Sequence, residues 1–201
     1  MNNSWDDVED LLVACAQDDL EDTGEVQPAL VAFAGDALRF IAWLRPFAKG
    51  AYAEPLIELF ALAAPLDADR LAVSIAGRAW SLDDPIPPVS ADADLRQRIL
   101  LLHRCDGAAG TPRARSTLHA FDLTADGVAW GERHELGSGE GWIPRALEVA
   151  IRTRDRLRAP DAEIGRQARR VVELGHDLHV APDVAHRLEA ALPPPRPRTT
   201  F

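Results

Sequence analysis

Three histidines and one cysteine lie in what the sequence predicts to be neighbouring β-strands. His103 and Cys105 are two residues apart, and His119 and His134 lie in the next two strand-like runs. Alternate residues of a strand share one face of a sheet, so a suitable register would bring the imidazoles together. A set of His, His and Cys side chains could bind zinc, but no recognised zinc-ligand spacing occurs among them. We therefore expect a partly exposed sheet face with ordinary polar residues and no metal.

The turn between the last two runs decides whether His119 and His134 meet. A two-residue loop at Asp126-Gly127 would place His119 opposite His134. A three-residue loop over residues 125–127, with a glycine bulge, would place His119 opposite Arg133 instead. The three-residue form is the commoner one for this turn sequence, so we expect the two histidines not to pair.

A glycine-rich segment, Gly137-Ser138-Gly139-Glu140-Gly141, lies between the last strand-like run and a helical run. At such a position backbone N–H groups and a helix N-terminus can hold a phosphate. The segment lacks the other features of a dinucleotide-binding motif or a P-loop, and Glu140 would repel an anion. We interpret it as a strand-to-helix connection. Ser138 and Cys105 are the candidate nucleophiles, and the sequence identifies a base for neither.

A third group of polar residues lies near the C-terminus. His176 and His179 are three residues apart, which would place both imidazoles on one face of a helix. Pro182 interrupts that helix, so Asp183 and His186 need not join them, and we interpret the group as polar residues at helix ends. The sequence contains no HExxH, GxSxG, Walker A or paired CxxC motif.

The first set of candidates depends on an antiparallel meander over residues 98–136. Its short β-rich runs are separated by turn-like segments at residues 106–112 and 124–127. An alternating run at residues 70–75 adds a strand. The sequence thus predicts an α+β fold with a small antiparallel sheet of three to five strands, covered by an N-terminal helical hairpin and C-terminal helices.

Helical patterns lie on both sides of the meander. Ser4 would cap a first helix, with Asp7 three residues later as a variant of the capping box, and Gly24 would end that helix. If residues 28–44 form a helix, its apolar side chains spread around most of the helical surface. The segment is therefore predicted to be a buried core helix. That helix would form the hairpin with a following helix that ends at Pro65.

The C-terminal third is predicted to contain three helices and a tail. We expect residues 1–192 to form a single α+β domain and residues 193–201 to form a flexible, proline-rich tail.

Composition and charge exclude several classes of protein. The chain has 201 residues, a formal charge of −10 and only two cysteines. Its first 69 residues carry 14 acidic and 3 basic side chains, and such an acidic surface disfavours nucleic-acid binding. The chain lacks the long uncharged segment of a membrane-spanning helix and the features of a signal peptide. Few cysteines and a strong preference for arginine over lysine suggest a cytoplasmic, bacterial protein.

These observations favour a cytoplasmic, non-catalytic binding or regulatory module that acts through a protein partner, with the acidic first helix as the contact surface. We expect no cofactor. The alternative is a small-molecule or metal-dependent enzyme with its site where the meander meets the loop Gly137–Gly141. Its titratable residues would be His103, His119, Asp122, Glu132 and His134. A third hypothesis gives the proline-rich tail a docking role.

Overall fold

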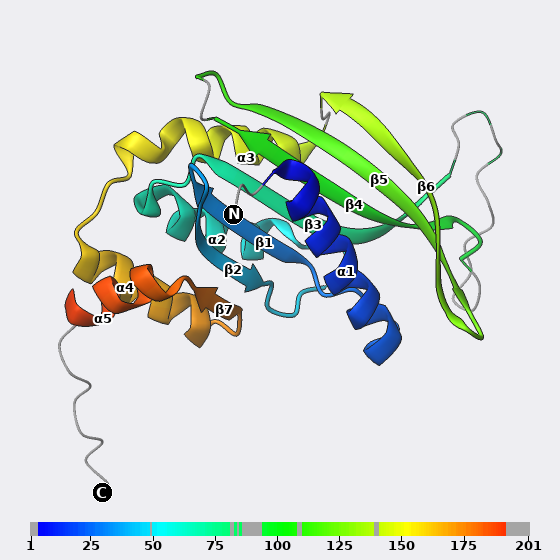
Figure 1. Ribbon diagram of the computed structural model, residues 1–201, viewed down its shortest axis with the longest axis horizontal. Helices are drawn as coiled ribbons and strands as arrows, with labels where there is room; N and C mark the ends of the chain where they lie inside the picture. Colours follow the sequence, from blue (N-terminus) through cyan, green and yellow to red (C-terminus); the bar gives the residue numbers. More distant parts are fainter. Residues whose placement is uncertain are drawn as a thin grey trace, which may run out of the picture.

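The computed structural model describes residues 4–48, 50–80, 83, 85, 94–107, 110–138 and 141–191. Within these ranges the chain forms a seven-stranded antiparallel sheet of order β6-β5-β4-β3-β1-β2-β7, together with five α-helices. Helix α1 crosses one face of the sheet, and α2 and α3 lie on the other (Figure 1). The predicted α+β class and antiparallel sheet are confirmed. The expected number of three to five strands is wrong.

The elements have the following bounds along the chain: α1 (Trp5–Thr23), β1 (Ala29–Ala34), β2 (Ala37–Trp43), α2 (Ala53–Ala63), β3 (Arg70–Ala79), β4 (Gln97–Asp106), β5 (Arg113–Thr124), β6 (Gly127–Ser138), α3 (Trp142–Thr153), α4 (Asp161–Glu173), β7 (Asp177–Val180) and α5 (Pro182–Ala191). Two short 3-10 turns, Ala64–Leu66 and Arg154–Arg156, follow α2 and α3. The predicted tail over residues 193–201 lies outside the described residues. No helix in the described part of the chain has the length and apolar character that crossing a membrane requires.

Helix α1 begins and ends where its sequence predicts. The Ser4 hydroxyl accepts a hydrogen bond from the Asp7 backbone N–H at 3.2 Å, and the Ser4 N–H donates to the Asp7 carboxylate at 3.0 Å. This reciprocal pair is the predicted capping box. At the other end, Gly24 adopts a φ of 75°, a left-handed conformation that glycine takes without strain.

Residues 29–43 form the hairpin of β1 and β2, so the core helix predicted over residues 28–44 is wrong. Gly35, with a φ of 55°, and Asp36 form the turn between Ala34 and Ala37. Strand β1 lies between β2 and β3 and is covered by helices on both faces. Its sequence is therefore apolar throughout and shows no alternation, a pattern that a buried helix shares. Of the predicted N-terminal helical hairpin, only α2 exists.

The predicted meander is confirmed as β4, β5 and β6, but its last turn differs from both expected forms. Thr124 pairs with Gly127, so the loop consists of Ala125 and Asp126. Between His119 and Phe121 the register shifts by one residue, because β6 carries an extra residue opposite β5. This bulge places His119 opposite Arg133, as expected, although a strand irregularity is responsible and not the loop.

Two apolar cores lie on the two faces of the sheet. The larger core packs α2, α3, α4 and α5 against one face, and the smaller core packs α1 against the other. Helix α1 contributes the buried side chains Val8, Leu12, Ala16 and Leu20 to the smaller core. The end of β4 and the start of β5 lie beside the first turn of α1, and this junction positions the candidate site.

Changing Gly107 to alanine should test how closely α3 packs on the end of β4. A Cβ at this position would overlap the Cγ2 atom of Ile151, which is buried in the larger core. We expect the change to lower the free energy of unfolding by about 1–3 kcal/mol, measured by chemical denaturation. The control is Gly77→Ala, whose Cβ would lie 3.7 Å from Ile99 in ordinary contact. Equal stability of the two variants would contradict this packing, whereas the loss in the double variant Gly107→Ala, Ile151→Ala should be smaller than the sum of the two single losses.

Candidate anion-binding site

Three arginines come together where β4 meets β5 on the face that α1 covers. Arg104 lies directly opposite Arg115, and Asp106 lies directly opposite Arg113. Because alternate residues of a strand share a face, these four side chains lie on the same side of the sheet. Together with Trp5 and Thr111 they line a cleft of about 580 Å³, which we call the arginine cleft.

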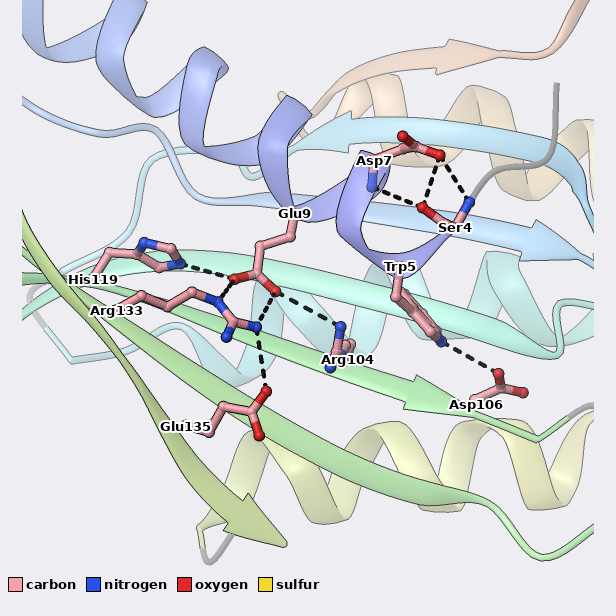
Figure 2. Close-up of polar contacts among 9 residues, drawn as sticks. All are labelled: Ser4, Trp5, Asp7, Glu9, Arg104, Asp106, His119, Arg133 and Glu135. Atoms are coloured by element: carbon pink, nitrogen blue, oxygen red, sulfur yellow. Dashed lines mark hydrogen bonds and ion pairs between the residues drawn. The ribbon is translucent and has the colours of Figure 1, made fainter.

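Trp5 forms one wall of the arginine cleft and is held from two directions. Its indole N–H donates a hydrogen bond to the Asp106 carboxylate at 3.2 Å (Figure 2). The guanidinium groups of Arg70 and Arg104 lie 4.6 Å and 5.9 Å from the centroid of the Trp5 ring, within cation–π range. The first residue of α1 is thereby fixed against the end of β4.

Positive charge exceeds negative charge in the arginine cleft. Arg113 and Arg115 are exposed, and neither forms an ion pair with a carboxylate in the described part of the chain. Arg104 has one weak ion pair, with its Nη1 atom 3.7 Å from Glu9, and that buried nitrogen makes no hydrogen bond among the described residues. Like charges placed directly opposite on neighbouring strands destabilise a sheet, so the pairing of Arg104 with Arg115 opposes folding.

A second cleft of about 360 Å³ lies next to the first and shares Arg104 with it. At its centre is Glu9, which is only 7% exposed. Arg133 donates to the Glu9 carboxylate at 2.6 Å and 3.3 Å, and the Nε2 atom of His119 donates at 3.0 Å (Figure 2). These bonds join α1 to β5 and β6.

Burial by itself would raise the pKa of Glu9, but the hydrogen bonds from Arg133 and His119 outweigh burial. The pKa of Glu9 therefore lies below its usual value, and the carboxylate is charged at neutral pH. On this face of the sheet, the guanidinium of Arg133 and the imidazole of His119 thus bind the Glu9 carboxylate as hydrogen-bond donors. The adjacent arginine cleft offers the same kind of donors.

The three histidines of the predicted site do not converge. His103 points to the face opposite α1, where it is buried and lies 2.8 Å from the Ser116 hydroxyl. Burial lowers the pKa of His103 to about 4. His119 lies on the α1 face, bound to Glu9, whereas His134 is exposed and pairs with Leu118, which points away from that face.

The other predicted site residues also lie apart. Asp122 pairs with Ala129 near the β5–β6 turn, and Gly137 lies at the opposite end of β6. Glu132 is exposed in the middle of β6. Gly139 lies outside the described residues, and Ser138 is placed only through its backbone, which pairs with Arg115.

Of the two candidate nucleophiles, Cys105 gains no reactive setting, because its thiol is buried. Burial raises the pKa of the Cys105 thiol to about 12. The described residues contain no group of three or more His, Cys, Asp and Glu side chains placed to share a metal ion.

The predicted helical pair of His176 and His179 is wrong, because helix α4 ends at Glu173 and residues 177–180 form strand β7. Gly175, with a φ of 101°, makes the break. The two side chains therefore lie on opposite sides of an extended chain, His176 fully buried and His179 exposed.

His176 is part of a buried polar cluster that joins three elements. Its Nδ1 atom accepts a hydrogen bond from the Arg45 backbone N–H at 3.2 Å, and its Nε2 atom donates to Glu58 at 2.7 Å. The Arg45 side chain also donates to Glu58, at 2.9 Å and 3.1 Å. The Arg45 hydrogen bonds hold the pKa of Glu58 below its usual value. With both ring nitrogens of His176 occupied, the cluster connects β2, α2 and β7 as a structural unit.

Sequence reasoning missed the residues of the arginine cleft, whereas in the second cleft it had named His119 as a candidate and the acidic first helix as a contact surface. A signal was present, because Arg113 and Arg115 alternate along β5 and Arg104 lies on the neighbouring strand. Reading these three residues as one sheet face would have predicted a basic patch. Glu9 gave no such signal, since it is one of several carboxylates in the first helix. No family model, curated protein sequence or solved structure shows a significant match to this chain.

Proposed function

We propose that the protein is a non-catalytic binding module that holds an anionic group of a partner protein in the arginine cleft. The observation that carries this proposal is the direct opposition of Arg104 and Arg115, with Arg113 beside them, in a cleft with a single carboxylate. Such an arrangement opposes folding, and it concentrates positive potential at one place on a chain with a formal charge of −10. A bound anion would relieve the repulsion between the arginines.

The acidic first helix contributes to this surface through part of its charge. Asp7 accepts a hydrogen bond from the Ser4 backbone N–H in the capping box, Glu9 is buried, and Asp19 accepts a hydrogen bond from the Gln27 backbone N–H. Asp6 and Asp10 remain exposed and line the second cleft, which contains Glu9 and lies beside the arginine cleft. We therefore propose a partner that carries a basic residue next to its anionic group, because that pairing would match both signs of charge.

We propose a non-catalytic role because the candidate titratable side chains do not lie together at one site. His103 and His119 lie on opposite faces of the sheet, and His119 is engaged with Glu9. We also propose a cytoplasmic location, which is supported by the two free cysteines, Cys15 and Cys105.

A photo-cross-linkable amino acid at the exposed position 111 should capture the partner in the cells that produce the full chain. We expect a protein adduct that disappears when Arg113 and Arg115 are both changed to glutamine, because both side chains line the cleft beside Thr111. The same amino acid at Glu163, exposed on α4, is the control and should not give this adduct. An adduct that persists in the double variant, or no adduct at position 111, would contradict the proposal.

A further inference from the structure

We infer that the anionic group held in the arginine cleft is a phosphoryl group on a side chain of the partner protein. This inference rests on the proposed function and names the chemical class of its ligand. It begins from the charge of the cleft, which is lined by three guanidinium groups and the carboxylate of Asp106. The lining therefore has a net charge of about +2, whereas a phosphoryl group carries about −1.5 to −2 at neutral pH. A carboxylate would leave about one positive charge unmatched.

The arrangement of the donors also fits a tetrahedral anion. Arg104 and Arg115 lie side by side on neighbouring strands, and Arg113 lies two residues from Arg115 on the same face of the sheet. Three guanidinium groups therefore line one cleft, and each can donate a pair of parallel hydrogen bonds. Three oxygens of a phosphoryl group can each receive one arginine, whereas a carboxylate has only two oxygens. The Thr111 hydroxyl adds a neutral donor at the rim.

Arg104 retains hydrogen-bonding capacity although it lies beside Glu9. The Glu9 carboxylate takes its short hydrogen bonds from Arg133 and His119, and the nearest Arg104 nitrogen is 3.7 Å away. Glu9 therefore depends little on Arg104, and a phosphoryl group could engage this guanidinium without dismantling the contact between α1 and β6.

The size of the cleft favours a phosphorylated side chain over a free phosphate ion. A volume of about 580 Å³ lies within the range of sites that hold organic ligands, roughly 300–1,000 Å³. The Trp5 ring supplies an apolar wall for the residue that bears the phosphoryl group. Recognition of a phosphorylated segment by clustered arginines is a mode that this arrangement can support.

The test is a titration of the full chain, by calorimetry, with three peptide libraries of matched flanking composition and with inorganic phosphate. The libraries carry phosphoserine, glutamate or serine at a fixed central position. We expect the phosphoserine library to bind at least ten times more tightly than the glutamate library, with no measurable binding of the serine library. Affinity for phosphoserine should fall between pH 7 and pH 5.5, because the second phosphate pKa is about 6.

Matched variants assign the binding to the cleft. Arg113→Gln combined with Arg115→Gln should weaken phosphoserine binding at least ten-fold. Arg166→Gln combined with Arg170→Gln, two exposed positions on α4, changes the net charge equally and should leave binding within two-fold. Equal loss in both double variants would overturn the assignment to this cleft.

The outcomes separate the inference from the proposed function. Glutamate binding as tight as phosphoserine binding, with both lost in the cleft variant, would overturn the phosphoryl inference and leave the binding module intact. Inorganic phosphate that binds as tightly as the phosphoserine library would overturn the inference that a protein carries the group. Failure of all probes would overturn the phosphoryl inference, and the cross-linking result at position 111 would then decide the proposed function alone.

Discussion

Replacing Glu9 with glutamine should lower the free energy of unfolding by about 2–3 kcal/mol. Glutamine has nearly the same shape but no charge, so it weakens the hydrogen bonds from Arg133 and His119 and leaves the Arg133 guanidinium without its anion. Breaking a buried ion pair typically costs about 3–5 kcal/mol. We expect less here because the Arg133 side chain is 42% exposed and can be rehydrated. The corresponding change in melting temperature is roughly 4 to 12 °C.

The effect of Glu9→Gln should depend on pH in one direction. The folded protein holds the pKa of Glu9 below its usual value of 4.5, so folding stabilises the charged carboxylate. The contribution of the Glu9 carboxylate to the free energy of unfolding is complete above the pKa that Glu9 has in the unfolded chain. It is lost as the pH falls through the lower pKa that Glu9 has in the folded protein. The difference in stability between the wild type and Glu9→Gln should therefore shrink as the pH falls below about 4.5. His103 titrates in both proteins and cancels from this difference.

A matched control for Glu9→Gln is Asp10→Asn, which removes the same charge from the adjacent, exposed position of α1. This change should alter the free energy of unfolding by no more than about 0.5 kcal/mol. Similar losses in the two variants, measured by urea denaturation, would show that Glu9 acts only through the general charge of the helix. The structure would then be wrong about the specific network.

Replacing His176 with alanine should lower the free energy of unfolding by about 3–4 kcal/mol. The side chain is fully buried, so its removal leaves a cavity. It also removes a partner from the Arg45 backbone N–H and from the carboxylate of Glu58. A buried polar group without its hydrogen bond typically costs about 1–3 kcal/mol. Amide hydrogen exchange should show the largest loss of protection in β7, the edge strand that follows His176.

His179→Ala provides the control for the His176 variant. His179 lies three residues later on β7, and its side chain is 65% exposed. Its Nε2 atom lies 3.1 Å from the Asp177 carboxylate at the surface, and such a contact contributes at most about 1 kcal/mol. The two variants have the same composition, so the difference between them reports burial and hydrogen bonding. Equal denaturation midpoints and equal exchange in β7 would contradict the role of His176 as the link between β2, α2 and β7.

Local signals in the sequence were reliable where neighbouring residues alone determine the conformation. The Ser4 and Asp7 capping box and the glycine at position 24 correctly placed the two ends of α1. The alternating runs and turn residues over residues 98–136 correctly indicated three antiparallel strands. In these segments the hydrogen bonds or the side-chain alternation depend on residues close together in the chain.

Signals failed where pairing with distant strands decides the conformation of a segment. The apolar run over residues 29–34 has no periodicity, because helices on both faces of the sheet bury the first five positions of β1. At the C-terminus, the spacing of His176 and His179 suggested a helix because nothing local revealed that residues 177–180 extend the sheet beside β2. The pairing of distant strands decided both segments.

The sequence by itself determined the α+β class, the meander, the bounds of α1 and the charge of the chain. Only the tertiary structure decided which charged side chains are buried, paired or gathered in a cleft. It buries Glu9 against Arg133, 124 residues away in the chain, and brings Trp5 to a cleft formed by Arg104, Arg113 and Arg115. The physical reason is that capping and alternation are short-range properties, whereas the burial and pairing of a charge depend on which distant elements pack against it.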